Sequence, residues 1–446
     1  MDFLKYIVVI AIGALASMLA NRGIAVFNDG FRAIVPQYYD GQISRKELGA
    51  MSFAISFGLV IGFGLPTSIA ATIILIHCLL LTTDIIGTWC PDSKLGLIAS
   101  GVIGGVYGLL LLVGLEFIVK LFGLLPYNFL NDLGSVSVYM TIAFAIFPAV
   151  AVAYQHGFGK GTITAVITVV AWFLFKKFGT FPIGDRTFTL NADGMAMLVG
   201  VIMMLVFAAQ IKGEGASNAA LTKVFSAKLE RIRKNWFLLA IMGGLLAAGT
   251  SLAIVAGDPA SLAALGNGQN VEGGMIALAR AIGFVPLVFT TSIVTGVYAP
   301  AGCTFVFVVG MFLYQNPIVA LLVGAGVMIV ELLLINVFAN VMDKMPGVKD
   351  MGEHIRTSMN KVIEITLMVG AVVGAEKTAA AVGLSGIGAM FVIACVLLNR
   401  RSKKPIVEMA IGPVACILFG LLVNVLLVIG LVALPVAEFH SISLIP

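Results

Sequence analysis

The residues of this sequence that could carry chemistry lie inside long apolar stretches. Asp84 follows Thr82 and Thr83 and comes two helical turns after His77, so the two ionisable side chains share one face of a helix. An ionisable group near the middle of a bilayer costs on the order of 2.5–3.5 kcal/mol, and such groups usually face a cavity or a partner. We therefore predict a polar site around Asp84. The alternative is a carboxylate solvated at the inner membrane interface.

A second acidic residue, Glu331, lies near the middle of the apolar run that begins at Pro317, and two carboxamides, Asn336 and Asn340, follow it. A carboxylate with carboxamides suits coupling to a proton or cation, or binding of a polar solute. The alternative is an interhelical hydrogen bond worth about 1 kcal/mol. Arg280 lies less than two turns inside its own apolar helix, where we expect its long side chain to reach the membrane interface.

The composition assigns these residues to a membrane protein. Of 446 residues, 60% are hydrophobic and only 11% are charged, against roughly 25% charged in an ordinary soluble domain. Mean hydropathy is +1.07. Too few charges are present to cover a soluble surface, which excludes a cytosolic enzyme, a secreted domain, a disordered chain and a nucleic-acid-binding protein.

Cysteine and histidine are scattered along the chain. The 5 cysteines form no Cys-x-x-Cys pair, and the 4 histidines lack the spacing of a helical metal site. We predict no disulfide framework, no metal site and no cofactor, and no motif indicates catalysis. The expected partners are the lipid bilayer and a small polar solute.

Apolar segments and loop charge predict the architecture. Since a spanning helix needs about 20 apolar residues, the charge-free stretches predict an all-α polytopic membrane protein with about 12–14 transmembrane or re-entrant helices. Short segments such as 303–314 are expected to be re-entrant. Most of the 27 basic residues fall in a few short loops, including 21–47 and 212–235. Such loops are retained in the cytoplasm, so both termini are predicted outside.

Two of these cytoplasmic loops have apolar residues at helical spacing. Segments 24–35 and 221–232 each place charged residues opposite the apolar ones. We predict an interfacial helix in each, lying on the anionic inner leaflet. The alternative is an ordinary basic loop.

The sequence also indicates an internal repeat. Segment 82–91 (TTDIIGTWCP) resembles segment 290–300 (TTSIVTGVYAP) about half the chain later, and the order of elements before them is similar. This pattern predicts two membrane halves, 1–190 and 191–398, followed by a C-terminal transmembrane helix in 399–446. Transporters are commonly built from two such halves, which are parallel or inverted. A chance match between apolar sequences is the alternative.

Three segments support a resemblance to a known family. The opening residues 1–5 (MDFLK), segment 28–32 (NDGFR) and Thr82-Thr83-Asp84 are similar to the YhfT family of bacterial inner-membrane proteins. The resemblance implies a bacterial inner-membrane protein and implies no activity. In that membrane, the termini that loop charge predicts outside would be periplasmic. A fainter resemblance links segment 298–301 (YAPA) to ascorbate- and galactitol-type permease components of the sugar phosphotransferase system. Those proteins are elevator transporters with two repeats and re-entrant hairpins.

Together these observations predict a secondary transporter of a small polar solute, with a site between paired broken helices near the midplane. Asp84 or Glu331 would carry the coupling proton or cation, and a homodimer is expected if the protein moves as an elevator. Hydroxyl and backbone ligands would come from Thr82, Thr83, Thr290, Thr291 and Ser292, with Asn336 and Asn340 nearby and His77 and Arg280 as further candidates. The alternatives are a phosphotransferase-type permease subunit, and a membrane scaffold or membrane-embedded enzyme.

Overall fold

The computed structural model describes residues 2–32, 34–183, 186–190, 192–211, 229–300, 304–342, 346–403, 405 and 408–434. The first part contains α1 (Asp2–Asn21), α2 (Asp29–Arg32), α3 (Val35–Tyr39), α4 (Arg45–Leu59), the π-helical turn η1 (Val60–Gly64), α5 (Leu65–Ala71), β1 (Ile74–Leu75), α6 (Ile76–Trp89) and α7 (Lys94–Gly123). The middle part contains α8 (Leu130–Leu133), α9 (Ser135–His156), α10 (Phe158–Phe178), the hairpin β2 (Thr180–Ile183) and β3 (Arg186–Thr189), and α11 (Ala192–Ala209). The last part contains α13 (Trp236–Ser251), β4 (Val255–Ala256), α14 (Pro259–Gly266), α15 (Asn270–Thr295), α16 (Phe305–Phe312), α17 (Pro317–Met342), α18 (Pro346–Ala381), α19 (Ile387–Arg401) and α20 (Glu408–Val428).

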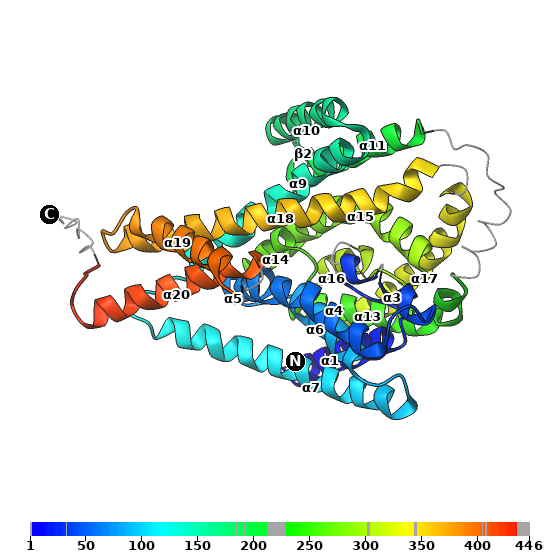
Figure 1. The fold of residues 1–446 in the computed structure, drawn as a ribbon, viewed down its shortest axis with the longest axis horizontal. Helices are drawn as coiled ribbons and strands as arrows, with labels where there is room; N and C mark the ends of the chain where they lie inside the picture. Colours follow the sequence, from blue (N-terminus) through cyan, green and yellow to red (C-terminus); the bar gives the residue numbers. More distant parts are fainter. Residues whose placement is uncertain are drawn as a thin grey trace.

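The predicted class, an all-helical polytopic membrane protein, agrees with this architecture. Among the described residues, 8 helices are long and apolar enough to cross a membrane, or 9 if the bent α15 is counted as one span. The sequence-based count was higher because several apolar runs fold as shorter helices, among them α6 and α13. Helices α9, α10 and α11 gather on one side of the molecule, and α18 runs along its length against α9 (Figure 1).

Extended backbone crosses the middle of the helical bundle at two places. At the first, β1 pairs in parallel with β4, and the Ile74 amide donates to the Ile254 carbonyl at 3.0 Å. At the second, Ala25 forms a parallel bridge with Tyr298, and the Val26 amide donates to the Tyr298 carbonyl at 3.0 Å. Backbone groups in an apolar interior must be paired, and each strand supplies the partners of the other. We call these places the β1–β4 crossing and the Ala25–Tyr298 crossing.

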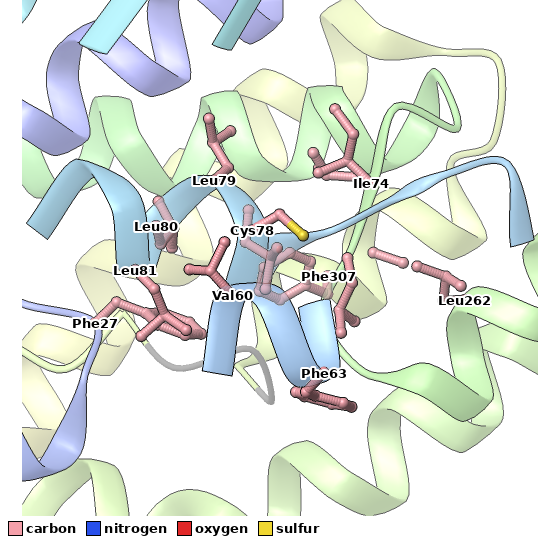
Figure 2. Packing of buried hydrophobic residues seen from close by; sticks show 14 of the residues in the cluster. Phe27, Val60, Phe63, Ile74, Cys78, Leu79, Leu80, Leu81, Leu262 and Phe307 are labelled. Atoms are coloured by element: carbon pink, nitrogen blue, oxygen red, sulfur yellow. The ribbon is translucent and has the colours of Figure 1, made fainter. Parts of the chain in front are cut away.

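Each crossing joins the segment after one helix to the segment before another. Residues after α1 pair with residues before α16, and residues after α13 pair with residues before α6. Around the β1–β4 crossing, Ile74 and Leu262 belong to the same buried apolar cluster as Phe307 and Cys78 (Figure 2). Parts of the chain that are distant in sequence are therefore held together at the core.

Helices α1 and α13 end in the same backbone turn. The Ile24 amide donates to the Leu19 carbonyl at 2.9 Å, and the Ile254 amide donates to the Gly249 carbonyl at 2.9 Å. The turn requires a residue with left-handed backbone, which is Gly23 (φ 56°) after α1 and Ala253 (φ 54°) after α13. Glycine adopts this conformation readily, whereas alanine is strained in it.

Ala253→Gly is therefore expected to stabilise the protein by about 0.5–1 kcal/mol, because relief of 1–2 kcal/mol of left-handed strain outweighs the extra backbone entropy of glycine. Gly23→Ala is the reciprocal variant and should destabilise, since its new Cβ would also meet the Tyr39 ring. Detergent-purified variants can be compared by denaturant titration in mixed micelles. A destabilising Ala253→Gly would contradict the strain at this turn.

The predicted interfacial helix in 24–35 is wrong. Residues 24–28 are not helical, Ala25 forms the bridge with Tyr298, and only the short helices α2 and α3 follow before residue 40. Ile24, Phe27, Phe31 and Arg32 are all buried within the protein. The apolar spacing reflects a segment surrounded by protein instead of one resting on lipid. The second predicted interfacial segment, 221–232, lies largely outside the described residues.

Candidate functional site

Asp84 holds the extended segment that follows α1. The side chain is 3% exposed, inside helix α6. Its Oδ1 accepts a hydrogen bond from the Phe27 amide at 3.2 Å, and its Oδ2 accepts one from the Asn28 amide at 2.9 Å. Both carboxylate oxygens therefore satisfy backbone amides that have left the helical ladder.

Helix α6 continues past Asp84 to Trp89 and does not unwind at Gly87. Gly87 instead lies where α6 packs closely on α1. A Cβ at this position would meet the Ser17 carbonyl at 2.5 Å. The break in regular helix comes before α6, at β1.

Arg32 connects this segment to α15. The guanidinium is fully buried: its Nε donates to the Val26 carbonyl at 3.0 Å, and its Nη2 pairs with Asp29 at 2.6 Å. Nη1 donates to the hydroxyl of Thr291 on α15. A buried cation needs this degree of pairing, because removing one partner leaves an uncompensated charge. Arg32 thus links the segment after α1 to α15 beside the Ala25–Tyr298 crossing.

Glu331 reaches the same crossing from α17. The Tyr298 hydroxyl donates to Glu331 Oε1 at 2.8 Å. The other oxygen, Oε2, is buried and has no hydrogen-bond partner in the described part of the chain. Ser292 Oγ accepts a hydrogen bond from the Ala299 amide at 3.1 Å and so fixes the backbone beside Tyr298. A buried carboxylate with one free oxygen is able to accept a proton or bind a cation.

The two similar sequence segments meet at one small cavity. Thr83 and Asp84 line it from segment 82–91, and Tyr298 and Pro300 line it from segment 290–300. The remaining walls are apolar, and the cavity has room for about one water molecule. The structure therefore brings Thr83, Asp84 and the 290–300 segment together around a small, closed cavity.

Other predicted residues lie elsewhere. Thr82 donates to the Cys78 carbonyl at 2.9 Å and contacts Tyr107 on α7, away from the cavity. His77 packs between the rings of Phe27 and Phe63, each centroid 4.9 Å away. Asn336 donates to the Leu332 carbonyl and lines an apolar groove beside Trp236. The side chains of Thr290 and Asn340 lie outside the part that the structure describes.

The β1–β4 crossing has its own buried ion pair, which sequence reasoning missed. Asp258 accepts hydrogen bonds from the amides of Ala260 and Ser261 and caps α14. Arg280 Nε lies 3.1 Å from Asp258 Oδ1, and both side chains are almost completely buried. The expectation that Arg280 reaches the membrane interface is therefore wrong. The Asp-Pro dipeptide at 258–259, typical of a helix start, was the available signal for Asp258.

Asn28 accepts a hydrogen bond from the backbone beside the Ala25–Tyr298 crossing in the same way that Asp258 does beside the β1–β4 crossing. Asn28 Oδ1 accepts from the Phe31 amide three residues later at 3.1 Å, as Asp258 Oδ1 accepts from Ser261 at 3.1 Å. Asn28 Nδ2 also donates to Ser56 Oγ at 3.0 Å. The two crossings therefore share a geometry and differ in charge.

A cleft of about 740 Å³ lies beside the β1–β4 crossing. One wall is the end of α5 at 67–72, immediately before β1, and another is α14, immediately after β4. Helices α8 and α9 and the first turn of α11 supply the remainder. The volume is within the usual range for small-molecule sites, about 300–1,000 Å³. Among the described residues, no group of three or more His, Cys, Asp and Glu side chains could hold a metal ion.

The fold and these sites define a multi-pass helical membrane protein with a buried ion pair at one strand crossing and a buried arginine at the other. The chain belongs to the YhfT family: the family model, described as "Protein of unknown function", matches residues 5–432. It is similar to the "Uncharacterized protein YhfT" of Escherichia coli (strain K12), with 33% identity over 445 residues, covering 96% of this chain and 98% of the relative. No solved structure matches.

Proposed function

We propose that this protein is a secondary transporter of a small polar solute in the bacterial inner membrane, coupled to a proton or cation. One observation carries the proposal: two pairs of extended segments cross in the bundle core, and each joins helix ends from different halves of the chain. Interrupted helices that meet near the midplane form the substrate and ion sites of many secondary transporters. Helical packing alone would not need such interruptions.

Matching contacts support two internal repeats, residues 2–123 and 236–342. Helix α1 packs on α6 and α7 as α13 packs on α16 and α17. Asn21 at the end of α1 donates to the Gly87 carbonyl in the last turn of α6, at 2.8 Å, and to the Pro91 carbonyl in the turn before α7, at 3.3 Å. Ser251 at the end of α13 likewise accepts from the Asn316 amide in the turn before α17, at 3.1 Å. These boundaries differ from the halves 1–190 and 191–398 expected from sequence.

The loop charges make the proposed repeats inverted. If residues 21–47 and 212–235 are both cytoplasmic, α1 ends inside and α13 begins inside, so the two helices cross the membrane in opposite directions. In a transporter with inverted repeats, each repeat can adopt the conformation of the other. This exchange produces the second state of the whole protein. The present asymmetry fits that scheme: a 740 Å³ cleft adjoins one crossing, and the other holds about one water.

Reconstituted protein is expected to accumulate solute against its gradient. Liposomes carrying an imposed proton or sodium gradient would be tested with radiolabelled amines, carboxylates and polyols. We expect saturable uptake of at least one class, lost when an ionophore collapses the gradient. Empty liposomes provide the control.

Two other results would favour the alternatives. A phosphotransferase-type permease subunit requires phosphoenolpyruvate and phosphocarrier proteins, and it releases a phosphorylated product. A scaffold or a membrane-embedded enzyme would give no flux with any solute class under any gradient. Either result would contradict secondary transport.

A further inference from the structure

We propose that the cleft beside the β1–β4 crossing binds a small organic cation, such as an alkyl amine, through the carboxylate of Asp193. The role of this cleft as a substrate site rests on the proposed transport function. The binding itself is a property of the folded protein and can be tested without transport.

The position of the cleft favours a ligand site. Thr72, at the end of α5, is two residues before β1, and Pro259, at the start of α14, is three residues after β4; both line the cleft. A ligand in the cleft would therefore contact α5, which precedes β1, and α14, which follows β4. These two helices belong to different proposed repeats. Solute binding at this place would be coupled directly to the relative position of the two halves.

The polar groups of the cleft are four neutral side chains and one carboxylate. The hydroxyls of Thr67 and Thr72 and the carboxamides of Asn131 and Asn267 can donate and accept hydrogen bonds, whereas the carboxylate of Asp193 only accepts them. Of the described residues that line the cleft, Asp193 is the charged one. The indole of Trp172 donates to Asp193 Oδ1 at 2.8 Å and so fixes the carboxylate. A fixed carboxylate in a partly apolar cleft attracts an ammonium group.

The helix ends at the cleft differ in sign. The continuous helical stretch Arg45–Ala71 ends there with the negative end of its dipole, whereas α9, α11 and α14 begin there with their positive ends. The Asp258 carboxylate caps α14, and Asp193 lies in the first turn of α11. The preference for a cation therefore depends on the Asp193 carboxylate.

The apolar part of the lining specifies the rest of the ligand. Leu130 and Leu262 lie in the cleft wall, and Val138 and Ile142 lie one turn apart on α9. These side chains suit a short alkyl chain beside the charged group. A polyol would leave this apolar surface without a partner and carries no positive charge to balance that of Asp193.

Charge-selective labelling of a cleft cysteine tests the inference. Ala263 is exposed in the cleft, so Ala263→Cys would be labelled with methanethiosulfonate reagents that carry either trimethylammonium or sulfonate, and read out by peptide mass spectrometry. At Ala263→Cys the cationic reagent should react faster than the anionic one. The ratio of the two rates should be about tenfold higher than at Gln42→Cys, the reference site in the exposed loop after α3. Asp193→Asn should reduce this preference to the loop value, whereas Asp40→Asn, an exposed aspartate elsewhere, should leave it unchanged.

Protection by matched four-carbon solutes identifies the ligand class. Millimolar 1,4-diaminobutane should slow labelling of Ala263→Cys by both reagents, and succinate and 1,4-butanediol should not. If Asp193→Asn does not fold, Asn267→Lys should reverse the charge preference and remove the protection. Protection by succinate, equal reagent rates, or a preference that survives Asp193→Asn would overturn the inference. Protection without uptake of any solute would refute only transport, and uptake without protection would refute only this site.

Discussion

Replacing Arg32 by methionine is expected to lower the free energy of unfolding by about 3–5 kcal/mol. The guanidinium is fully buried and donates to two backbone carbonyls, to Asp29 and to Thr291. Methionine has a similar length but no donor, so the carbonyls and the Asp29 carboxylate would lose their partner. The buried Asp84 carboxylate, close by, would also lose a neighbouring positive charge. Denaturant titration in mixed micelles measures the difference.

Arg22→Met provides the matched control. Arg22 pairs with Asp92 at 2.6 Å, the same distance as Arg32 to Asp29, but both partners are partly exposed. An exposed pair contributes about 0–1 kcal/mol, because water and side-chain entropy offset the attraction. The double variant Arg32→Met with Asp84→Asn should lose less than the sum of the two single losses, because the two residues interact. Equal losses for Arg22→Met and Arg32→Met would show that burial of Arg32 is unimportant.

Glu331→Gln is expected to abolish gradient-driven uptake while the fold is retained. Glutamine preserves the oxygen that accepts from Tyr298 and replaces Oε2, which has no partner in the described structure. The change therefore removes the capacity to take up a proton or cation without breaking a contact that the structure shows. Asp84 is the weaker candidate for coupling, since both its oxygens hold backbone amides.

Exchange measurements separate coupling from binding. Glu331→Gln should still catalyse exchange of labelled for unlabelled solute across the membrane, because exchange needs no net proton movement. Glu116→Gln, an exposed carboxylate on α7, is the chemical control and should keep wild-type uptake. Gradient-driven accumulation by Glu331→Gln at the wild-type rate would rule out Glu331 as the coupling residue.

Composition was sufficient for the class of protein, because too few charges are present to cover a soluble surface. Asp84 and Glu331 stand out in the sequence because a charge in an apolar run must find a partner, and both are buried and hydrogen-bonded in the structure. Segments 82–91 and 290–300 stand out by their similarity, and they line one cavity.

The features that the sequence could not reveal depend on contacts between residues that are far apart in the chain. The apolar spacing of 24–35 fits an interfacial helix equally well, and only the contact of Arg32 with Thr291, 259 residues away, shows that the segment is enclosed. Arg280 was misplaced for the same reason, since its partner Asp258 lies on another helix end. The two crossings leave no periodic signal, because each strand is only a few residues long.

The crossings have a consequence for biosynthesis. Residues 24–26 leave the ribosome long before Tyr298, yet the Ile24 carbonyl and the Val26 amide have their partners on Tyr298. Until that residue is inserted, these two groups need water as a partner and cannot be buried in an apolar interior. The first seven helices should therefore stay loosely assembled during translation, and they should reach their final packing only when the second half has entered the membrane. Separate expression of the two halves should yield stable protein only when both are made in the same cell.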